Sequence, residues 1–209
     1  MATSNYKIAV FISGGGSNFK AIHSAIQNGD IAAEIAFVLG STKNAGGLSY
    51  ANQNEITHFV PDAEIFTDES VFAELLLQKT KEYDVKLVVL AGFLKKIPAR
   101  FIHDFSGNII NIHPALLPSF GGKGMYGRHV HKAVLEYGCK ISGATVHLVN
   151  SGYDTGAPIV QRSVPVLPGD TPETLAERIL KIEHEILPET VAAFAADKIK
   201  IDGRHIYIE

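Results

Sequence analysis

The sequence predicts one α/β domain built on a doubly wound, mostly parallel sheet. Short apolar runs that suit buried strands alternate with amphipathic stretches that suit helices over the first half of the chain. In the second half, two expected strands follow each other with only a loop between them, so they should run antiparallel, and a terminal hairpin follows. Since 209 residues suit one large domain, we expect a single domain over residues 1–209.

The strands of the first half are short runs of apolar residues. The run at residues 87–90 is continuous in leucine and valine, as a strand buried on both faces should be. Pro114 ends the last run, because proline cannot donate to a ladder and restricts the residue before it. We expect parallel strands with right-handed connections at residues 8–12, 33–39, 57–60, 87–90 and 108–113.

The helices between these strands have recognisable starts or an apolar face. Phe19, Ile22 and Ile26 lie on one face of the first helix. Thr67 opens a longer helix with two acidic residues in its first turn, and Pro98 suits the first position of another. We expect helices at residues 18–28, 47–54, 67–83 and 98–105.

A glycine-rich loop at residues 119–127 opens the second half and precedes a helix at residues 129–137. The two antiparallel strands should cover residues 144–148 and 159–164. A helix follows over residues 171–195, and we expect an interruption near Pro188, which lacks a backbone N–H. The last segment, residues 198–208, alternates around Asp202-Gly203 and predicts a hairpin with a type I′ turn.

Composition excludes several classes of protein. A net charge of −3 and a pI of about 6.3 do not suit a nucleic-acid or membrane surface. Cys139 is the only cysteine, which excludes an internal disulfide and fits a reducing compartment. The longest apolar stretch, residues 87–94, is too short to span a bilayer, and no signal peptide is visible. We expect a cytoplasmic protein without nucleic-acid or membrane partners; its oligomeric state is left open.

Asn111 and His113 form the most informative pair in the chain. Two positions apart on a strand, their side chains point to the same face. Pro114 places them at the carboxyl end of the strand, where open α/β sheets bind ligands. An amide donor and an imidazole there can hold and protonate an oxygen that gains charge during a reaction. Taken alone, the pair fits equally well a core histidine beside a turn asparagine.

The glycine-rich turn after the first strand suits a phosphate group. Its glycines let backbone N–H groups approach an anion at a helix N-terminus, and the next two side chains add donors. A dinucleotide fingerprint fits badly, because Phe19 stands where its third glycine belongs, and no Gly-Lys-Ser/Thr of a Walker A loop follows. The alternative is a tight turn capped by a side chain. The expected phosphate-binding residues are Gly15, Gly16, Ser17 and Asn18.

Asp154 lies in a loop dense in turn formers, residues 150–158, between the two late strands. Beside His113 it could keep the imidazole protonated or pass protons through water. The alternative is an Asx turn that fixes the loop. His147, on the strand before this loop, suits a supporting role better than metal binding. No pair of histidines has zinc spacing and Cys139 is isolated, so we assign no metal.

A second wall of a binding pocket is expected at residues 90–98, after the fourth strand and at the same sheet edge. Small residues and an aromatic ring there suit a flat heterocycle pressed on the backbone, and Lys95 and Lys96 suit an acidic tail. Core packing at a strand–helix turn explains the composition equally well.

Together these segments resemble the phosphoribosylglycinamide formyltransferase (glycinamide ribonucleotide transformylase) family, folate-dependent enzymes of the third step of purine synthesis. The matching segments occur in the family's order and cover nearly the whole chain. They are Ile12-Ser13-Gly14-Gly15-Gly16-Ser17-Asn18, Leu90-Ala91-Gly92-Phe93, Asn111-Ile112-His113-Pro114-Ala115-Leu116-Leu117-Pro118, Ser142-Gly143-Ala144-Thr145-Val146-His147, Asp154-Thr155-Gly156-Ala157-Pro158 and Glu183-His184.

The resemblance implies a formyltransferase-type fold with a Rossmann-like amino-terminal half. Residues 1–106 would be the phosphate-binding half, and residues 107–209 the catalytic and folate-binding half. Asn111, His113 and Asp154 would be catalytic, and Glu183 would bind the sugar or glycinamide part of the substrate. The implied folate-binding residues are Leu94, Lys95, Lys96, Ile97, Asn111, Asn150, Ser151, Gly152, Tyr153 and Asp154.

The implied reaction transfers a formyl group from 10-formyltetrahydrofolate, a co-substrate, to the amine of phosphoribosylglycinamide, without a metal. The amine attacks the formyl carbon, and the tetrahedral intermediate carries negative charge on oxygen. Asn111 and protonated His113 would stabilise this oxygen, and Asp154 would favour the imidazolium and position a water that moves the proton. No nucleophile of the enzyme is required.

The sequence departs from the family pattern in three places. The loop that contains Lys123-Gly124-Met125-Tyr126 is longer. Leu180 stands where a glutamine or lysine often helps to hold the phosphate, so Lys181 or Arg178 would have to substitute. Glu69 stands where an arginine is expected near the glutamate tail of the folate.

Three other functions share part of this pattern. Methionyl-tRNA formyltransferase shares the catalytic residues but normally carries a basic carboxyl-terminal domain, whereas this chain is acidic and ends in a hairpin. Formyltetrahydrofolate hydrolase carries an extra amino-terminal domain, whereas the first strand here begins by residue 8. A non-catalytic phosphosugar-binding module would leave Asn111, His113 and Asp154 unexplained.

Overall fold

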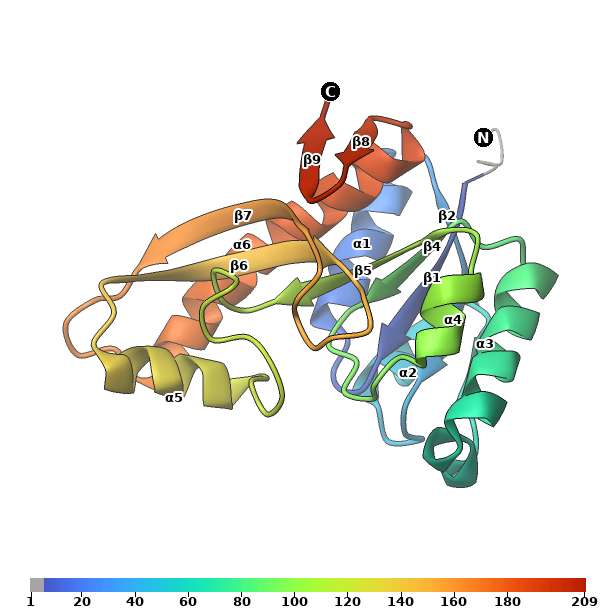
Figure 1. Ribbon diagram of the computed structural model, residues 1–209, viewed down its shortest axis with the longest axis horizontal. Coiled ribbons are helices and arrows are strands. Elements are labelled where there is room, and N and C mark those ends of the chain that lie inside the picture. The colour runs from blue at the N-terminus through green and yellow to red at the C-terminus, as the bar shows by residue number, and fades with distance from the viewer. Residues whose placement is uncertain (1–5) are drawn as a thin grey trace.

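A seven-stranded sheet runs through the centre of the computed structural model, which describes residues 6–209 (Figure 1). Its strand order is β3-β2-β1-β4-β5-β6-β7, and the first five strands in this order are parallel. β6 and β7 are antiparallel to each other, as expected, and β6 is also antiparallel to β5. The strands are β1 (Lys7–Ile12), β2 (Glu34–Gly40), β3 (His58–Phe59), β4 (Leu87–Leu90), β5 (Asn108–His113), β6 (Ile141–Leu148) and β7 (Pro158–Pro165).

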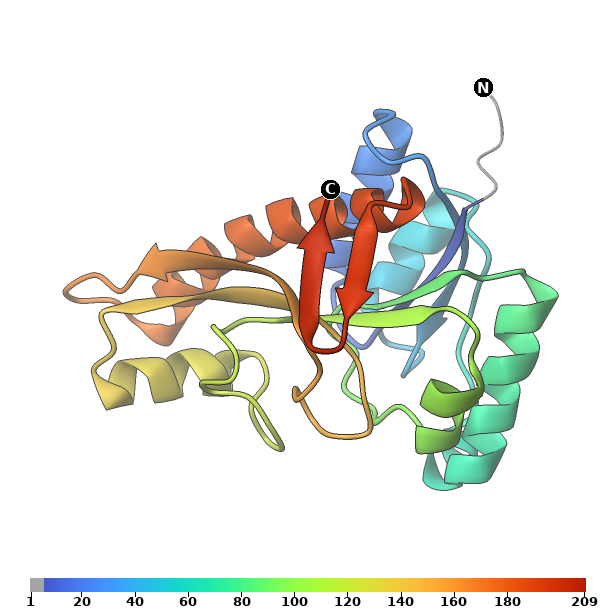
Figure 2. The same ribbon diagram turned by 45° about the horizontal axis from the view of Figure 1, so that its top comes forward.

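Helices cover both faces of the sheet, which confirms the doubly wound class (Figures 1 and 2). Alternate residues of β1 enter two different cores: Val10 packs with α1, α2, α5 and α6, and Phe11 packs with α3 and α4. No helix within residues 6–209 is both long and apolar enough to cross a membrane. The helices are α1 (Ser17–Gln27), α2 (Gly46–Gln53), α3 (Glu69–Glu82), α4 (Ala99–Asp104), α5 (Arg128–Tyr137) and α6 (Pro172–Ala195).

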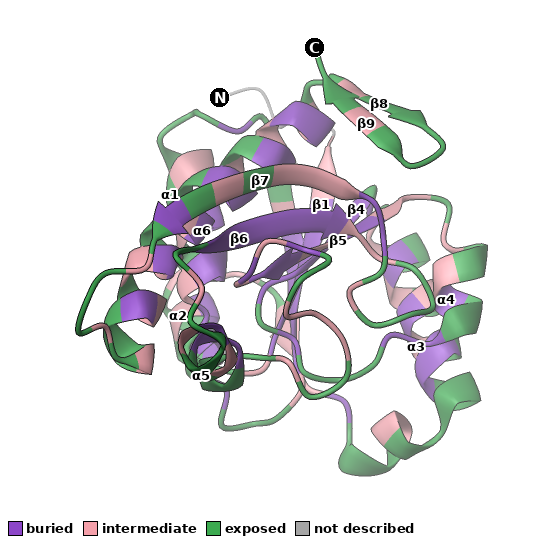
Figure 3. Ribbon diagram, turned by 60° about the vertical axis from the view of Figure 1, so that its left-hand side comes forward, coloured by how far each residue is buried: buried purple, intermediate pink, exposed green. Residues whose placement is uncertain are grey.

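Burial follows the position of each strand in the sheet (Figure 3). All four residues of β4 are buried, whereas β7, at the sheet edge, has one buried residue among eight. This difference is expected from the sequences, because β4 is continuously apolar and β7 carries three consecutive polar residues, Gln161 to Ser163. The predicted domain begins at residue 1, and residues 1–5 lie outside the described part.

The start of α3 corrects one prediction. Thr67 does not open this helix but ends a 3₁₀ turn, η1 (Ala63–Thr67). Asp68 is the N-cap, and its carboxylate accepts hydrogen bonds from the N–H groups of Ser70 and Val71 at 2.9 and 3.1 Å. A carboxylate satisfies these free donors, and its negative charge also interacts favourably with the positive end of the helix dipole. It therefore caps the helix better here than the threonine hydroxyl.

The predicted interruption near Pro188 is wrong, because α6 runs unbroken from Pro172 to Ala195. Proline inside a helix costs about 3 kcal/mol. Around it, Ile186, Leu187 and Val191 are fully buried. Burying one such side chain contributes about 1.5–3 kcal/mol, so the packing of this face offsets the cost.

The terminal hairpin is confirmed, but its turn differs from the prediction. Strands β8 (Ile199–Asp202) and β9 (His205–Ile208) pair with Asp202 opposite His205, so the turn residues are Gly203 and Arg204. Gly203 has a φ of +59°, and Arg204 is not among the residues with positive φ. One glycine with positive φ at the first position fits a type II′ turn, because type I′ requires two.

Candidate active site

A cavity of about 670 Å³ lies beside the carboxyl ends of β4 and β5. Its walls are the end of β5, the loop between β4 and α4, the glycine-rich loop, the loop between β6 and β7, and one face of α6. Asn18, Leu94 and His113 all line it, so segments that follow β1, β4 and β5 meet at one sheet edge as expected. This position is where open α/β sheets bind their ligands.

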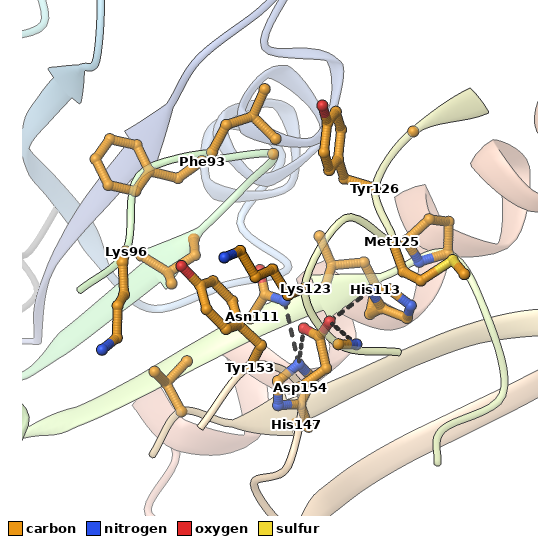
Figure 4. A pocket seen from close by; sticks show the side chains of 18 of the residues that line it. Phe93, Lys96, Asn111, His113, Lys123, Met125, Tyr126, His147, Tyr153 and Asp154 are labelled. Carbon is orange, nitrogen blue, oxygen red and sulfur yellow. Dashed lines mark hydrogen bonds and ion pairs between the residues drawn. The ribbon is translucent and has the colours of Figure 1, made fainter. Parts of the chain in front are cut away.

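Asn111 and His113 both line the cavity, which confirms that they share a face of β5. The amide Nδ2 of Asn111 lies 3.1 Å from Nε2 of His147, on the neighbouring strand β6 (Figure 4). Nδ1 of His147 lies 2.8 Å from the carbonyl oxygen of Leu148, which can only accept. His147 therefore donates from Nδ1 and accepts at Nε2, and this bond orients the Asn111 amide.

His113 is 3% exposed and sits between a carbonyl and a carboxylate. Its Nε2 donates to the carbonyl oxygen of Phe120 at 2.9 Å, and its Nδ1 lies 3.6 Å from Oδ2 of Asp154. The same carboxylate accepts a hydrogen bond from the N–H of Gly122 at 2.9 Å. Its other oxygen lies 3.6 Å from Nε2 of His147 (Figure 4). Asp154 thus contacts both histidines and the glycine-rich loop.

Burial decides the charge of His113 in this arrangement. Burial lowers the pKa of His113 below its ordinary value, although the charge of Asp154 and the bond to Phe120 act in the opposite direction. For Asp154, burial acts to raise the pKa, but the contacts with His147, Gly122 and His113 together lower it. The site therefore holds a carboxylate beside a mostly neutral imidazole at pH 7, whereas the sequence favoured a protonated His113.

The glycine turn is tied to its surroundings by short contacts. Gly16 is the N-cap of α1 with a φ of +70°, and a Cβ there would lie 2.9 Å from the Cα of Gly47. The hydroxyl of Ser13 accepts from the N–H of Leu94 at 2.8 Å. Among the predicted phosphate-binding residues, Asn18 lines the cavity, whereas Gly15, Gly16 and Ser17 form the turn beside it.

Asn18 also joins the two halves of the chain. Its Nδ2 donates to Oε2 of Glu183 on α6 at 2.6 Å, across 165 positions of sequence. Burial raises the pKa of Glu183, and the bond from Asn18 opposes this only in part. Oδ1 of Asn18 is buried without a hydrogen-bond partner. A buried acceptor without a partner is costly, so this end of the cavity suits a polar ligand that donates to it.

The expected folate-binding residues of both loops line the other side of the cavity, from Leu94 to Ile97 and from Asn150 to Asp154. Glu69 does not lie among them. Its carboxylate accepts from the N–H of Ala99 at 3.1 Å and so caps the N-terminus of α4. The departure from the family at this position is therefore explained by a structural contact.

The cavity is also lined by residues that the sequence did not single out for the site, among them His131 on α5 and Lys123, Met125 and Tyr126 on the glycine-rich loop. His131 is 5% exposed, and its Nδ1 is buried without a partner. The helical repeat could have indicated its burial, because it lies beside Val130 and three positions before Val134, both buried. Within residues 6–209, no group of three or more metal-ligating side chains is suitably arranged.

Comparison with known proteins agrees with this geometry. The sequence profile of the family described as formyl transferase matches residues 6–191. A phosphoribosylglycinamide formyltransferase of Haemophilus influenzae is 34% identical over 97% of this chain and 93% of its own. A chloroplastic one of Arabidopsis thaliana is 45% identical over 93% of this chain. The chain spans 67% of that plant protein and 62% of its counterpart in Vigna unguiculata.

Solved structures show the same similarity. The crystal structure of glycinamide ribonucleotide transformylase 1 from Symbiobacterium toebii superposes with a TM-score of 0.90 and 37% identity, over 97% of this chain and 93% of that one. The phosphoribosylglycinamide formyltransferase of Coxiella burnetii gives a TM-score of 0.88, at the same identity and coverage.

Proposed function

The chain belongs to the formyl transferase family, among the phosphoribosylglycinamide formyltransferases, and we propose that its cavity brings 10-formyltetrahydrofolate to 5-phosphoribosylglycinamide. It is an enzyme of formyl transfer in purine biosynthesis. The observation that carries the proposal is the contact of Asp154 with His113 beside Asn111 in one cavity. Residues 1–106 contribute the phosphate-binding turn, and residues 107–209 contribute the catalytic residues and much of the folate pocket.

The chemical step is a direct attack. The neutral amine of the ribotide attacks the formyl carbon, the C=O π electrons move to oxygen, and a tetrahedral intermediate forms. In this proposal the amide of Asn111, which lies 3.1 Å from His147, stabilises this oxygen, and His113 adds to the stabilisation once it gains a proton. A pre-oriented donor of this kind contributes roughly 3–4 kcal/mol to the transition state.

The proton then moves from the attacking nitrogen to the leaving nitrogen of the folate. The attacking nitrogen, which becomes an ammonium in the intermediate, gives up one proton through water to Nδ1 of His113, which faces Asp154 at 3.6 Å, and the imidazolium then passes it through water to the folate nitrogen. The carboxylate stabilises the imidazolium at that moment and positions the water that relays the proton. The C–N bond to the folate breaks as its nitrogen is protonated, and tetrahydrofolate and the formylated ribotide leave.

The substrates occupy opposite ends of the cavity in this proposal. The backbone of Gly15 to Ser17, with Asn18, binds the phosphate, and Glu183 binds the glycinamide or sugar part. Leu94 to Ile97 and Asn150 to Asp154 enclose the folate. No metal is used. We place the enzyme in the cytoplasm, as its single cysteine suits a reducing compartment, although plant relatives are chloroplastic.

One assay tests the proposed function. The pure protein is mixed with 10-formyltetrahydrofolate and phosphoribosylglycinamide, and tetrahydrofolate formation is followed with time. We expect stoichiometric formation of the formylated ribotide. Tetrahydrofolate release without the ribotide would instead indicate a hydrolase, and no release with both substrates would overturn the proposal.

A further inference from the structure

The cavity has an imbalance of charge at its phosphate end. A phosphate monoester carries nearly two negative charges at pH 7. The glycine turn supplies backbone N–H groups and the N-terminus of α1, but the face of α6 that lines the cavity supplies no cation. Its lining residues are Ala176, Glu177, Leu180 and Glu183. A dianion beside two carboxyl side chains requires a positive partner from elsewhere.

Neither of the two basic residues of α6 nearest to Leu180 can supply this positive charge. Arg178 donates to both carboxylate oxygens of Asp170, at 2.7 and 2.8 Å, and to the carbonyl oxygen of Pro165 at 2.9 Å. Lys181 is exposed and does not line the cavity. The substitution expected from the sequence at Arg178 or Lys181 is therefore not supported by the structure.

Only three lysines line the cavity among residues 6–209: Lys95, Lys96 and Lys123. Lys95 places its Nζ 5.3 Å from the ring centre of Phe66, outside the cavity lining. Lys96 extends away from Asn111 and His113 (Figure 4). Lys123 instead extends into the cavity, and none of the hydrogen bonds or ion pairs within the described residues occupies its ammonium group (Figure 4).

The backbone before Lys123 is held by the catalytic residues. The carbonyl of Phe120 accepts from His113, and the N–H of Gly122 donates to Asp154. Gly122 and Gly124, on either side of Lys123, have φ values of +101° and +89°, which residues other than glycine rarely adopt. The loop therefore needs these glycines to turn its lysine inward while it remains attached to His113 and Asp154.

We propose that Lys123 binds the phosphate of the ribotide substrate and supplies the cation that α6 lacks. The inference rests on the proposed function, because it takes the glycine turn as the phosphate site. The ammonium group would donate a charge-assisted hydrogen bond to the phosphate from the glycine-rich loop. The backbone N–H groups of the glycine turn would donate to the same phosphate from the other side. The longer loop of this chain thereby takes part in substrate recognition.

The test compares Lys123→Gln and Lys123→Arg with the matched control Lys132→Gln. Lys132 is an exposed lysine of α5 that lies 3.5 Å from Glu136 and does not line the cavity. We expect Lys123→Gln to raise the KM for phosphoribosylglycinamide and the inhibition constant of inorganic phosphate by roughly 10–100-fold. The KM for 10-formyltetrahydrofolate and kcat should stay within a few-fold, and Lys123→Arg should restore most of the affinity. The control should match the unmodified protein.

Other outcomes overturn the proposal. An unchanged KM for the ribotide, or an unchanged inhibition constant for phosphate, would show that Lys123 does not contact the phosphate. A rise confined to the folate KM would assign Lys123 to the folate carboxylates, and a fall confined to kcat would assign it to the reacting oxygen. Inactivity of the unmodified protein would overturn the proposed function instead. Calorimetric binding of inorganic phosphate to the unmodified protein and to Lys123→Gln tests the lysine independently of turnover.

Discussion

The two halves of the molecule build their parts of the site from different atoms. The first half offers backbone: a glycine turn follows the largely buried strand β1, and a Cβ added at Gly16 would collide with Gly47 of α2. The second half offers side chains from β5, from β6 and from two loops, with His113 and His147 almost fully buried. A backbone site should be sensitive to a Cβ added where the turn is tightly packed, whereas a side-chain site should be sensitive to the loss of a single charge.

The largest expected effect is a fall in kcat, from a substitution in the second half of the chain, which supplies the side chains of the site. Asp154→Asn keeps an acceptor for the N–H of Gly122 but removes the charge beside His113. General acid–base steps are commonly worth about 10²–10⁴ in rate, so kcat should fall by that factor, with both KM values little changed. Steady-state kinetics measure this, with Asp202→Asn on the exposed hairpin as the control.

Asp154 and His113 should act as one unit in the reaction. His113→Asn should reduce kcat similarly, and the double variant should be far less than multiplicatively worse. Near-normal kcat in Asp154→Asn would make Asp154 a residue that only caps the loop, and the reaction would depend on His113 and Asn111 alone.

The second prediction concerns the backbone half. Gly16→Ala places a Cβ at a φ of +70° and 2.9 Å from the Cα of Gly47, so the turn must distort. The apparent KM for phosphoribosylglycinamide should rise roughly 10-fold or more, well above the change for the folate, because a displaced N–H loses its charge-assisted bond to phosphate. Gly14→Ala is the matched control, since nothing lies within 4 Å of its added Cβ. Equal effects on both substrates would show that the turn supports the fold.

The third prediction concerns pH and compares buried histidines with a buried carboxyl group. Burial lowers the pKa values of His23, His113, His131 and His184, so the unfolded chain binds more protons than the folded chain below pH 6.5. The free energy of unfolding should therefore fall as the pH drops from 7 to 5. The raised pKa of Glu183 acts in the opposite direction. Urea unfolding should show a steeper fall in Glu183→Gln and a shallower one in His131→Gln; a pH-independent midpoint would contradict the argument.

The smallest effect is expected outside both halves of the site. Cys139 is partly buried against the core and does not line the cavity. Cys139→Ser should leave kcat within a few-fold, because no step of the proposed reaction uses a thiol. Loss of turnover with an unchanged unfolding midpoint would indicate a thiol step.

Much of the fold could be predicted because local pattern and tertiary structure agree. Leu87–Leu90 is continuously apolar and is buried on both faces, and the antiparallel pairing of β6 with β7 follows from the short connection between them. The continuous helix through Pro188 could not be predicted, since its stability depends on packing against distant strands. The turn of the hairpin was shifted by one residue because strand register, not the Asp-Gly pair alone, decides which residues turn.

The candidate site likewise combines features that the sequence could predict with features that it could not. Asn111 and His113 could be placed on one face because strands alternate with period two. The protonation state of His113 could not be predicted, because it depends on two opposing effects of the fold. Burial of the ring lowers its pKa, and the charge of Asp154 raises it. The cap that Glu69 forms on α4 is likewise a contact with another segment of the chain, 30 positions away.

The hydrogen bond between Asn18 and Glu183 has a consequence for how the protein is made. A ribosome releases α1 early and α6 near the end, so the nascent chain carries the glycine turn for most of its synthesis without the helix that packs on α1. Contacts between residues so far apart in sequence form late. The growing chain therefore cannot gain stability from a ligand that needs both helices until nearly all of it has been translated, and until then the apolar face of α1 that packs on α6 stays exposed.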